Sequence, residues 1–354
     1  MIISETPHRI SFFGGGTDYP VWYREHSGAV LATSIDKYCF ITCRYLPRFF
    51  EHRYRIVYSR IELVTALADI QHPSVRECLR FMGIGRGVEI HHNGDIPART
   101  GMASSSAFTV GLLRALHALL GEAPDPLELA REAITVEQDL IGESVGSQDQ
   151  TIVACGGFQR IDFHQNGGVR LTPLTLRPAR LEELQRHLLL VYTGVSRNAS
   201  EIAGEQIKQT PRNGHELHRL YEMVGEAISL LSSSADIAQF GRLLDEAWQL
   251  KRGLSSKIST DYIDQLYAGA RSRGAIGGKL LGAGGGGFFL LFARPEDHAR
   301  ILGGLNGLVH VPFRFTDSGS RIIYHGEMRE DGLPPEELLR PPRGRWDLVT
   351  EAAG

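Results

Sequence analysis

The chain has 354 residues, of which 42% are hydrophobic and 22% are charged, and its formal net charge is −3. This length allows two domains at about 150 residues each, and the composition supports a sizeable core. The nearly balanced charge argues against a protein that coats a polyanion, so nucleic acid is not expected as a partner and any phosphate must be bound in a local pocket.

The four cysteines share neither a metal-ligand spacing nor a disulfide pattern; they are Cys39, Cys43, Cys78 and Cys155. We therefore expect buried thiols in a reducing compartment. The N-terminus lacks a basic region followed by an apolar core, and no apolar run approaches the roughly 18 residues of a membrane span. The sequence predicts a cytoplasmic protein without a membrane partner.

A glycine triplet, Gly14 to Gly16, follows the first strand-like run, which ends at Phe13. Three glycines permit backbone torsions and close approaches that side chains would forbid. Arg9 and Asp18 flank the triplet, so a turn here could bring a cation and a carboxylate to one small polar ligand. The alternative is a tight turn with a surface ion pair.

Runs rich in β-branched and aromatic residues predict the strands, and helical periodicity predicts the helices. The expected strands are Ala29–Ile35, Tyr38–Tyr45, Tyr54–Tyr58, Val88–His92, Phe158–Phe163, Val169–Leu174, Leu188–Tyr192 and two runs within Val309–Tyr324. The expected helices are 73–82, 127–141, 216–231, 237–250, 262–273 and 295–305, with another opening at 196–200. The proline- and charge-rich end, residues 334–354, is expected to wrap the surface or fray.

The stretch from Asp95 to Leu120 begins with small residues and continues with helical periodicity. Gly101 to Ser106 precede the expected helix, and serine is a favoured cap for its free N–H groups. A helix start built of small residues lets an anion approach those groups closely. The segment is therefore either a phosphate cradle or a capped core helix behind a flexible turn; it lacks the Gly-Lys-Ser/Thr ending of a Walker loop.

Two acidic residues follow this helix. Glu137 lies in the expected helix 127–141, and Asp149 lies after a glycine-punctuated loop, near the start of a short helix. Asp149 is a candidate base, whereas the alternative is simple stabilisation of a helix start. Further along, Arg197 and Lys208 provide positive charge that would suit a second phosphate on the substrate, and Lys257 is a further candidate. The alternative for Arg197 and Lys208 is an exposed basic residue without a ligand.

The stretch 277–292 is a glycine-rich turn that runs into a continuous apolar strand. This pattern fits a loop pressed against another backbone or a ligand, followed by a central strand. The glycines precede a strand instead of joining a strand to a helix, which argues against a dinucleotide-binding oxidoreductase.

Three of these segments, in this order, resemble the motifs of the GHMP kinases, the superfamily of galactokinase, homoserine kinase and mevalonate kinase. They are residues 7–19, 97–107 and 279–288, and together they span nearly the whole chain. The resemblance implies an α+β fold, with an N-terminal α/β domain like that of ribosomal protein S5 and a C-terminal ferredoxin-like α+β domain. We expect the domains at 1–180 and 181–330, with a tail at 331–354.

The resemblance also implies the cofactors, ATP and Mg²⁺, and a set of site residues. The residues that match ATP-binding positions are Gly101, Met102, Ala103, Ser104, Ser105 and Ser106, and those that match the Mg²⁺ positions are Ser105 and Glu137. Asp149 matches the carboxylate that accepts or orients the acceptor hydroxyl, and Arg9 matches the arginine beside it. The expected substrate-binding residues are Arg9, Gly15, Gly16, Thr17, Asp18, Asp149, Gly194, Arg197 and Gly284.

Within the superfamily the motifs most resemble those of bacterial D-glycero-α-D-manno-heptose 7-phosphate kinases, which phosphorylate the anomeric hydroxyl for nucleotide-activated heptose and surface polysaccharides. Gly15 and Gly16 stand where galactokinases carry Glu and His, which implies space for a larger or phosphorylated sugar. The alternatives are a kinase for another sugar, such as fucose or a galactose-like hexose, and a catalytically silent sugar-sensing regulator. A homo-oligomer is possible, and the sequence leaves the oligomeric state open.

Overall fold

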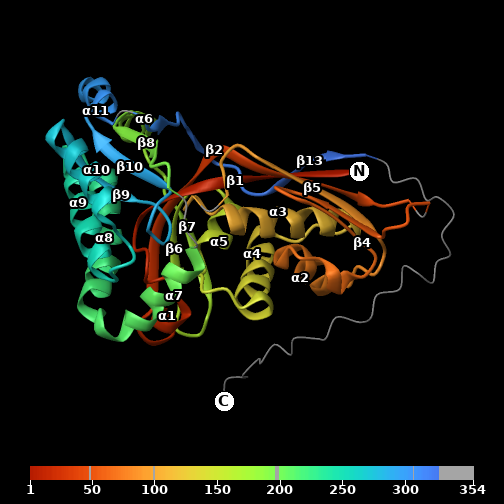
Figure 1. Cartoon of the computed structure of the whole chain (residues 1–354). Coiled ribbons are helices and arrows are strands. Elements are labelled where there is room, and N and C mark those ends of the chain that lie inside the picture. The colour runs from red at the N-terminus through yellow and green to blue at the C-terminus, as the bar shows by residue number, and fades with distance from the viewer. Residues whose placement is uncertain (48, 99, 196–198, 306, 327–354) are drawn as a thin grey trace, which may run out of the picture.

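The structure is a computed structural model that describes residues 1–47, 49–98, 100–195, 199–305 and 307–326. Figure 1 shows a large sheet with helices α2 to α5 beneath it and, at the other end of the molecule, a smaller sheet flanked by helices α8 to α10. The predicted tail at 331–354 lies outside the described residues. No helix among those described is long and apolar enough to cross a membrane.

The elements of the first half alternate strands with short helices. The strands are β1 (Ile2–Phe13), β2 (Gly28–Tyr45), β3 (Tyr54–Val57), β4 (Ile61–Val64), β5 (Val88–Gly94), β6 (Phe158–Phe163) and β7 (Val169–Pro173). The helices are α1 (Pro20–His26), η1 (Leu67–Asp69), α2 (Pro73–Phe81), α3 (Ser104–Leu119), α4 (Pro126–Ile134), the π-helix η2 (Thr135–Ile141) and α5 (Gln148–Cys155).

The second half is mainly helical around four strands. Its helices are α6 (Pro178–Arg186), α7 (Ala199–Gln209), η3 (Thr210–Arg212), α8 (Gly214–Ser232), α9 (Ala238–Gly253), α10 (Asp261–Ser272), η4 (Pro295–Asp297) and α11 (His298–Gly304). Its strands are β8 (Leu188–Tyr192), β9 (Ala275–Leu280), β10 (Phe288–Ala293) and β11 (Val309–His310), and two more, β12 (Phe315–Thr316) and β13 (Arg321–His325), return to the first sheet.

The first sheet has the strand order β13-β1-β2-β5-β3-β4, with β6 and β12 also paired to β2. The prediction of two strands at 29–35 and 38–45 is wrong, because β2 runs unbroken from Gly28 to Tyr45. It stays continuous because β1 pairs along most of its length, while β6 pairs with its first part and β5 with its last part.

The second sheet has the order β11-β8-β10-β9. Residues 277–279, expected in a turn, lie in strand β9, so that expectation is wrong. A Cβ at Gly277 would lie 1.9 Å from the carbonyl oxygen of Gly241 in α9. The glycine therefore serves close packing of the helix on the strand, not a turn.

The end of β1 belongs to the core of the second half. Phe12 and Phe13 pack on Phe240 of α9, with ring centroids 5.6 and 5.2 Å apart, and Phe240 contacts Phe292 of β10. The strands β12 and β13 pair with β2 and β1 of the first sheet. They fall within the predicted second domain, 181–330, by sequence, but in the structure they extend the sheet of the first half. A shared core thus fixes the position of the first motif relative to the second half.

Candidate active site

The loop before α3 carries free amide groups. Helix α3 begins at Ser104, and its N-cap is Ala103 in the left-handed conformation, with φ of 61° and no side-chain cap. The expectation that a serine caps this helix is therefore wrong, because the serines already lie in its first turn. Among the described residues no side chain caps the N–H groups of that turn, which is the arrangement that suits an anion.

Two neighbouring residues of β1 bind consecutive carbonyl groups of this loop. His8 Nδ1 donates to the carbonyl oxygen of Met102 at 3.0 Å, and Arg9 Nη1 donates to that of Gly101 at 2.7 Å. Burial lowers the pKa of His8 to about 4, so the imidazole is neutral and its proton lies on Nδ1. Since the C=O and N–H of one peptide point in opposite directions, the amides of Met102 and Ala103 point away from β1.

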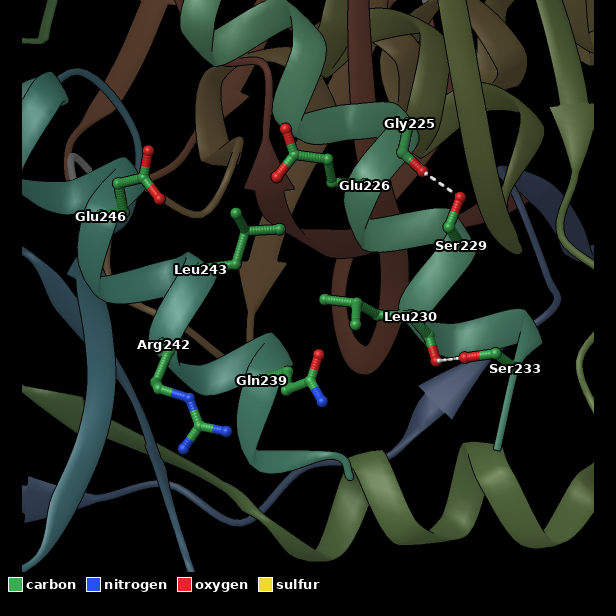
Figure 2. Close-up of a pocket in the computed structure, with 9 residues that line it drawn as sticks. All are labelled: Gly225, Glu226, Ser229, Leu230, Ser233, Gln239, Arg242, Leu243 and Glu246. Carbon is green, nitrogen blue, oxygen red and sulfur yellow. Dashed lines mark hydrogen bonds between the residues drawn. The ribbon is translucent and has the colours of Figure 1, made fainter. Parts of the chain in front are cut away.

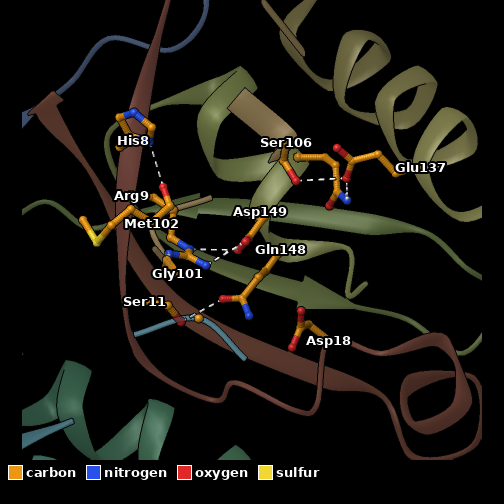
Figure 3. A network of polar contacts seen from close by, with 12 residues as sticks. His8, Arg9, Ser11, Asp18, Gly101, Met102, Ser106, Glu137, Gln148 and Asp149 are labelled. Atoms are coloured by element: carbon orange, nitrogen blue, oxygen red, sulfur yellow. Dashed lines mark hydrogen bonds and ion pairs between the residues drawn. The ribbon is translucent and has the colours of Figure 1, made fainter. Parts of the chain in front are cut away.

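The same arginine joins the loop to the candidate base (Figure 3). Arg9 Nε donates to Asp149 Oδ1 at 2.8 Å, and Nη2 donates to Oδ2 at 2.7 Å. This bidentate pair is strong and fixes the plane of the carboxylate. Arg9 is 2% exposed while the Asp149 side chain is 26% exposed, so the carboxylate is accessible to a ligand.

Glu137 is fully buried in the π-helix η2, and burial raises its pKa to about 7. Its Oε2 accepts from Ser106 Oγ at 2.9 Å and from Gln150 Nε2 at 2.5 Å. Its Oε1 makes no well-formed hydrogen bond to a described residue, although the Thr109 hydroxyl lies near enough to lower the pKa of the carboxyl, and the buried Oγ of Ser104 also lacks a partner among these residues. The hydrogen bonds of Ser106 and Gln150 to Glu137 were not predicted from the sequence. Ser105 is exposed, and the hydrogen bonds of the described residues do not join it to Glu137.

These oxygens fit a hard divalent cation. A buried carboxylate with one oxygen outside any well-formed hydrogen bond, next to the Ser106 hydroxyl, is the donor type that Mg²⁺ prefers, and phosphates can supply the other ligands. Within the described ranges no group of three or more His, Cys, Asp or Glu residues could hold a metal ion. A cation here would therefore depend on phosphate oxygens as well as on Glu137.

The turn after β1 uses most of its polar groups internally. Thr17 Oγ1 lies 2.8 Å from the carbonyl oxygen of Gly14 and accepts from the amide of Ala29 at 3.1 Å. Asp18 is 2% exposed, its Oδ1 accepts from the amide of Gly16, and burial raises its pKa. The structure therefore places Thr17 and Asp18 within the turn's own hydrogen bonds.

The expected open volume at the glycines exists at only one of two positions. A Cβ at Gly16 would lie 2.9 Å from Gln206 Nε2 and 3.1 Å from Leu217 Cδ2, so that space is filled and the expectation for Gly16 is wrong. A Cβ at Gly15 would meet nothing closer than Gln148 Nε2 at 3.9 Å. Gly15 is thus the position that borders free space.

The third motif lies directly on the second. A Cβ at Gly101 would lie 2.4 Å from the carbonyl oxygen of Leu281, and Phe288 N donates to the carbonyl oxygen of Thr100 at 3.2 Å. Gly284 packs instead on Ile258, and a Cβ at Gly194 would have no neighbour within 4 Å. The structure thus brings the motifs together, while no contact between described residues places Gly194 or Gly284 beside Asp149.

Two buried lysines lie behind these loops. Lys251 Nζ donates to the carbonyl oxygens of Leu280 and Gly282 at 3.1 and 2.5 Å, and Lys279 Nζ donates to that of Phe12 at 2.9 Å. Burial lowers the pKa of Lys251 to about 8 and that of Lys279 well below its usual range. Sequence reasoning missed Lys251, because a single lysine in an amphipathic helix gives no signal of burial.

The basic residues expected to meet a second phosphate are not buried. Lys208 is exposed on α7, and the exposed Lys257 pairs with Glu201 at 2.7 Å. Arg197 lies outside the described residues. Neither Lys208 nor Lys257 therefore forms part of a buried, preorganised site for a phosphate.

A surface groove of about 950 Å³ lies between α8 and α9 (Figure 2). Its lining residues are Gly225, Glu226, Ser229, Leu230, Ser233, Gln239, Arg242, Leu243 and Glu246. Arg219 pairs with Glu226 and Glu246 at its rim. None of the lining residues belongs to the Arg9–Asp149 cluster, so the groove is not the candidate active site.

Comparison with known proteins identifies the family of both halves. A model of the GHMP kinases N terminal domain matches residues 66–157, and one of the GHMP kinases C terminal matches residues 226–304. A D-glycero-alpha-D-manno-heptose 7-phosphate kinase of Campylobacter jejuni is 26% identical over 90% of this chain and 97% of its own length. A bifunctional fucokinase/GDP-fucose pyrophosphorylase of Arabidopsis thaliana is 25% identical over 84% of this chain but only 30% of its own length.

The fold is that of a solved relative. The crystal structure of a D-glycero-D-manno-heptose 1-phosphate kinase from Bacteroides thetaiotaomicron has a TM-score of 0.76 and 23% identity, and the match covers 92% of this chain and all of that one. The predicted α+β fold and the predicted family are confirmed by these findings.

Proposed function

We propose that this chain, which belongs to the GHMP kinases and is an ATP-dependent sugar kinase, phosphorylates the anomeric C1 hydroxyl of D-glycero-α-D-manno-heptose 7-phosphate to give the 1,7-bisphosphate. The observation that carries the proposed chemistry is the Arg9 side chain, which binds both Asp149 and the carbonyl of Gly101. It links the acceptor side of the site to the phosphate loop. The heptose rests on the likeness to the Campylobacter jejuni protein over nearly the full length of both chains.

In the proposed mechanism ATP lies with its phosphates over the start of α3. The amides of Met102 and Ala103 and the helix dipole would stabilise negative charge on the transferred group. The sugar hydroxyl would donate to Asp149, whose orientation Arg9 fixes. The new bond forms between this oxygen and the γ-phosphorus as the bond to the ADP oxygen breaks, and the hydroxyl proton passes to Asp149.

Glu137 and Ser105 are the residues proposed to hold Mg²⁺, as the family resemblance implies. The Oε1 of Glu137, which makes no well-formed hydrogen bond to a described residue, supports the carboxylate ligand. Ser105 is exposed at the start of α3, so its hydroxyl is open to a nucleotide-bound cation. When bound, Mg²⁺ would neutralise phosphate charge.

A fucose-type hexose is the second candidate substrate. It is favoured by the name of the Arabidopsis thaliana relative, which matches most of this chain. The silent-regulator alternative is disfavoured, because a sensor needs none of the Arg9, Asp149 and Glu137 arrangement.

An ADP-release assay with Mg·ATP and a panel of heptose 7-phosphate, mannose, galactose and fucose tests the proposal. We expect turnover confined to the heptose phosphate, and phosphorus NMR of the product should show a new anomeric phosphate. Preference for a free hexose would keep the kinase and reject the heptose. Silence on every sugar would favour the regulator.

A further inference from the structure

Gln148 precedes Asp149 in the first turn of α5, and its half-buried side chain faces β1 (Figure 3). Ser11 Oγ donates to Gln148 Oε1 at 2.8 Å. A serine hydroxyl can donate or accept, so the orientation of the amide is decided by its other neighbour, the acceptor-only carboxylate of Asp18. The Nε2 end therefore points away from Ser11.

The direction of Nε2 is supported by Asp18. Burial raises the pKa of Asp18, and hydrogen bonds from the Gly16 amide and the Gln148 side chain oppose that rise. An amide nitrogen carries two N–H groups. The effect on the Asp18 pKa places Nε2 on the side of Asp18, and no hydrogen bond within the described residues occupies the second N–H.

Free space lies next to this second N–H. Gly15 is partly exposed, and a Cβ built there would lie 3.9 Å from Gln148 Nε2 with no closer neighbour. The φ of Gly15 is outside the left-handed region, in contrast to Gly14 and Gly16 with φ of 83° and 104°. Neither the backbone conformation nor the packing requires a glycine at position 15. The effect of the glycine is therefore to leave free volume beside Gln148 Nε2, at the sugar side of the site.

We propose that Gln148 is a specificity-determining residue that donates its free N–H to a hydroxyl of the sugar acceptor, in the space left open by Gly15. Ser11 and Asp18 hold the amide in its orientation, and Asp149 on the same helix turn binds the reacting hydroxyl. The ligand class is a polyhydroxylated sugar, with one hydroxyl bound by Gln148 and another by the adjacent Asp149. This inference rests on the proposed sugar kinase function, because it needs a polyol in the site.

Three variants test it by kinetics, using the best acceptor of the wild-type protein. Gln148→Ala removes the donor and should raise the sugar KM by about threefold to tenfold, the usual worth of one hydrogen bond. Gly15→Ala should raise the sugar KM as well, because its methyl group enters the acceptor space without straining the backbone. Ser11→Ala leaves the donor but frees its orientation, so a smaller rise is expected.

A loss of sugar recognition is distinguished from general damage to the protein by comparing the KM for the sugar with the KM for ATP. All three variants should keep the KM for ATP and the thermal unfolding midpoint of the wild type. Gln239→Ala, an exposed glutamine of the groove in Figure 2, is the matched control and should change neither KM. An unchanged sugar KM in both Gln148→Ala and Gly15→Ala, or a parallel rise in both KM values, would overturn the role of Gln148.

The two proposals fail separately. A wild-type protein that phosphorylates only a free hexose rejects the heptose, and the variants are then measured on that hexose. If no sugar is turned over, calorimetric binding of the same sugars replaces the KM. Loss of affinity in Gln148→Ala then supports the inference, and unchanged affinity or no binding by the wild type overturns it.

Discussion

The turn after β1 and the loop before α3 are both built of small residues, yet they use their hydrogen-bonding groups differently. In the turn, Thr17 and Asp18 bind backbone groups of residues 14–29. In the loop, His8 and Arg9 bind carbonyl groups and leave the amides of the α3 start free. Small residues therefore close the first segment on itself and open the second to a ligand.

The largest expected effect is on the carboxylate that both segments frame. Asp149→Asn should lower kcat by ~10²–10⁴ if Asp149 accepts the hydroxyl proton. The amide keeps one acceptor for the buried Arg9 but turns an N–H₂ group toward the other guanidinium donor, so the unfolding midpoint should fall, and kcat is compared well below it; ATP binding should change less. Steady-state kinetics together with thermal denaturation check this, and a near-wild-type kcat would remove Asp149 from the role of base.

Sequence reasoning predicted this carboxylate and its arginine from motif order, but it could not predict how the turn uses its side chains. The resemblance placed Thr17 and Asp18 with the substrate, because matching a motif gives the positions of residues in the chain but not the directions in which their side chains point. Their burial depends on β2, which brings Ala29 against the turn. Lys251 was not predicted, and neither was the hydrogen bond of Ser106, an expected ATP-binding residue, to Glu137, because these partners lie 29 and 31 residues away along the chain.

The closed turn should be sensitive to a single methyl group. Gly14 has φ of 83°, and a Cβ there would lie 1.9 Å from the carbonyl oxygen of Ala29. Gly14→Ala should therefore lower the free energy of unfolding by about 2–4 kcal/mol. Ala103→Gly, the opposite change at a left-handed residue of the loop, should cost less than about 1 kcal/mol. Urea denaturation of both variants measures the contrast, and equal losses would contradict it.

Hydroxyl deletions in the two segments should separate stability from nucleotide binding. Thr17→Val leaves the buried Ala29 amide without its acceptor and should cost about 1–3 kcal/mol of unfolding free energy, with little change in the KM for Mg·ATP. Ser105→Ala removes an exposed hydroxyl, so stability should stay within about 0.5 kcal/mol while the KM for Mg·ATP rises. A Ser105→Ala protein with unchanged Mg²⁺ dependence would reject the ligand assignment.

The smallest effect is expected at His8, which orients the loop without touching a substrate. His8→Leu removes the donor to Met102 and should raise the KM for ATP by about threefold to tenfold, while the sugar KM stays unchanged. His8→Asn keeps an N–H near the position of Nδ1 and should restore the ATP KM in large part. A loop held by packing alone would give equal values for the two variants.

The pH dependence of stability gives this prediction an independent check. The pKa of His8 falls from 6.5 to about 4 in the folded protein, mainly through burial, so the unfolded chain binds the extra proton between those values. The contribution of His8 to stability therefore increases as pH rises from about 4 to 6.5 and is constant above that window. The free energy of unfolding of the wild type, relative to that of His8→Asn, should increase as pH rises across this window. A difference that stays flat from pH 4 to 7 would mean that the imidazole is solvated, and the orientation of the Met102 peptide would then need another cause.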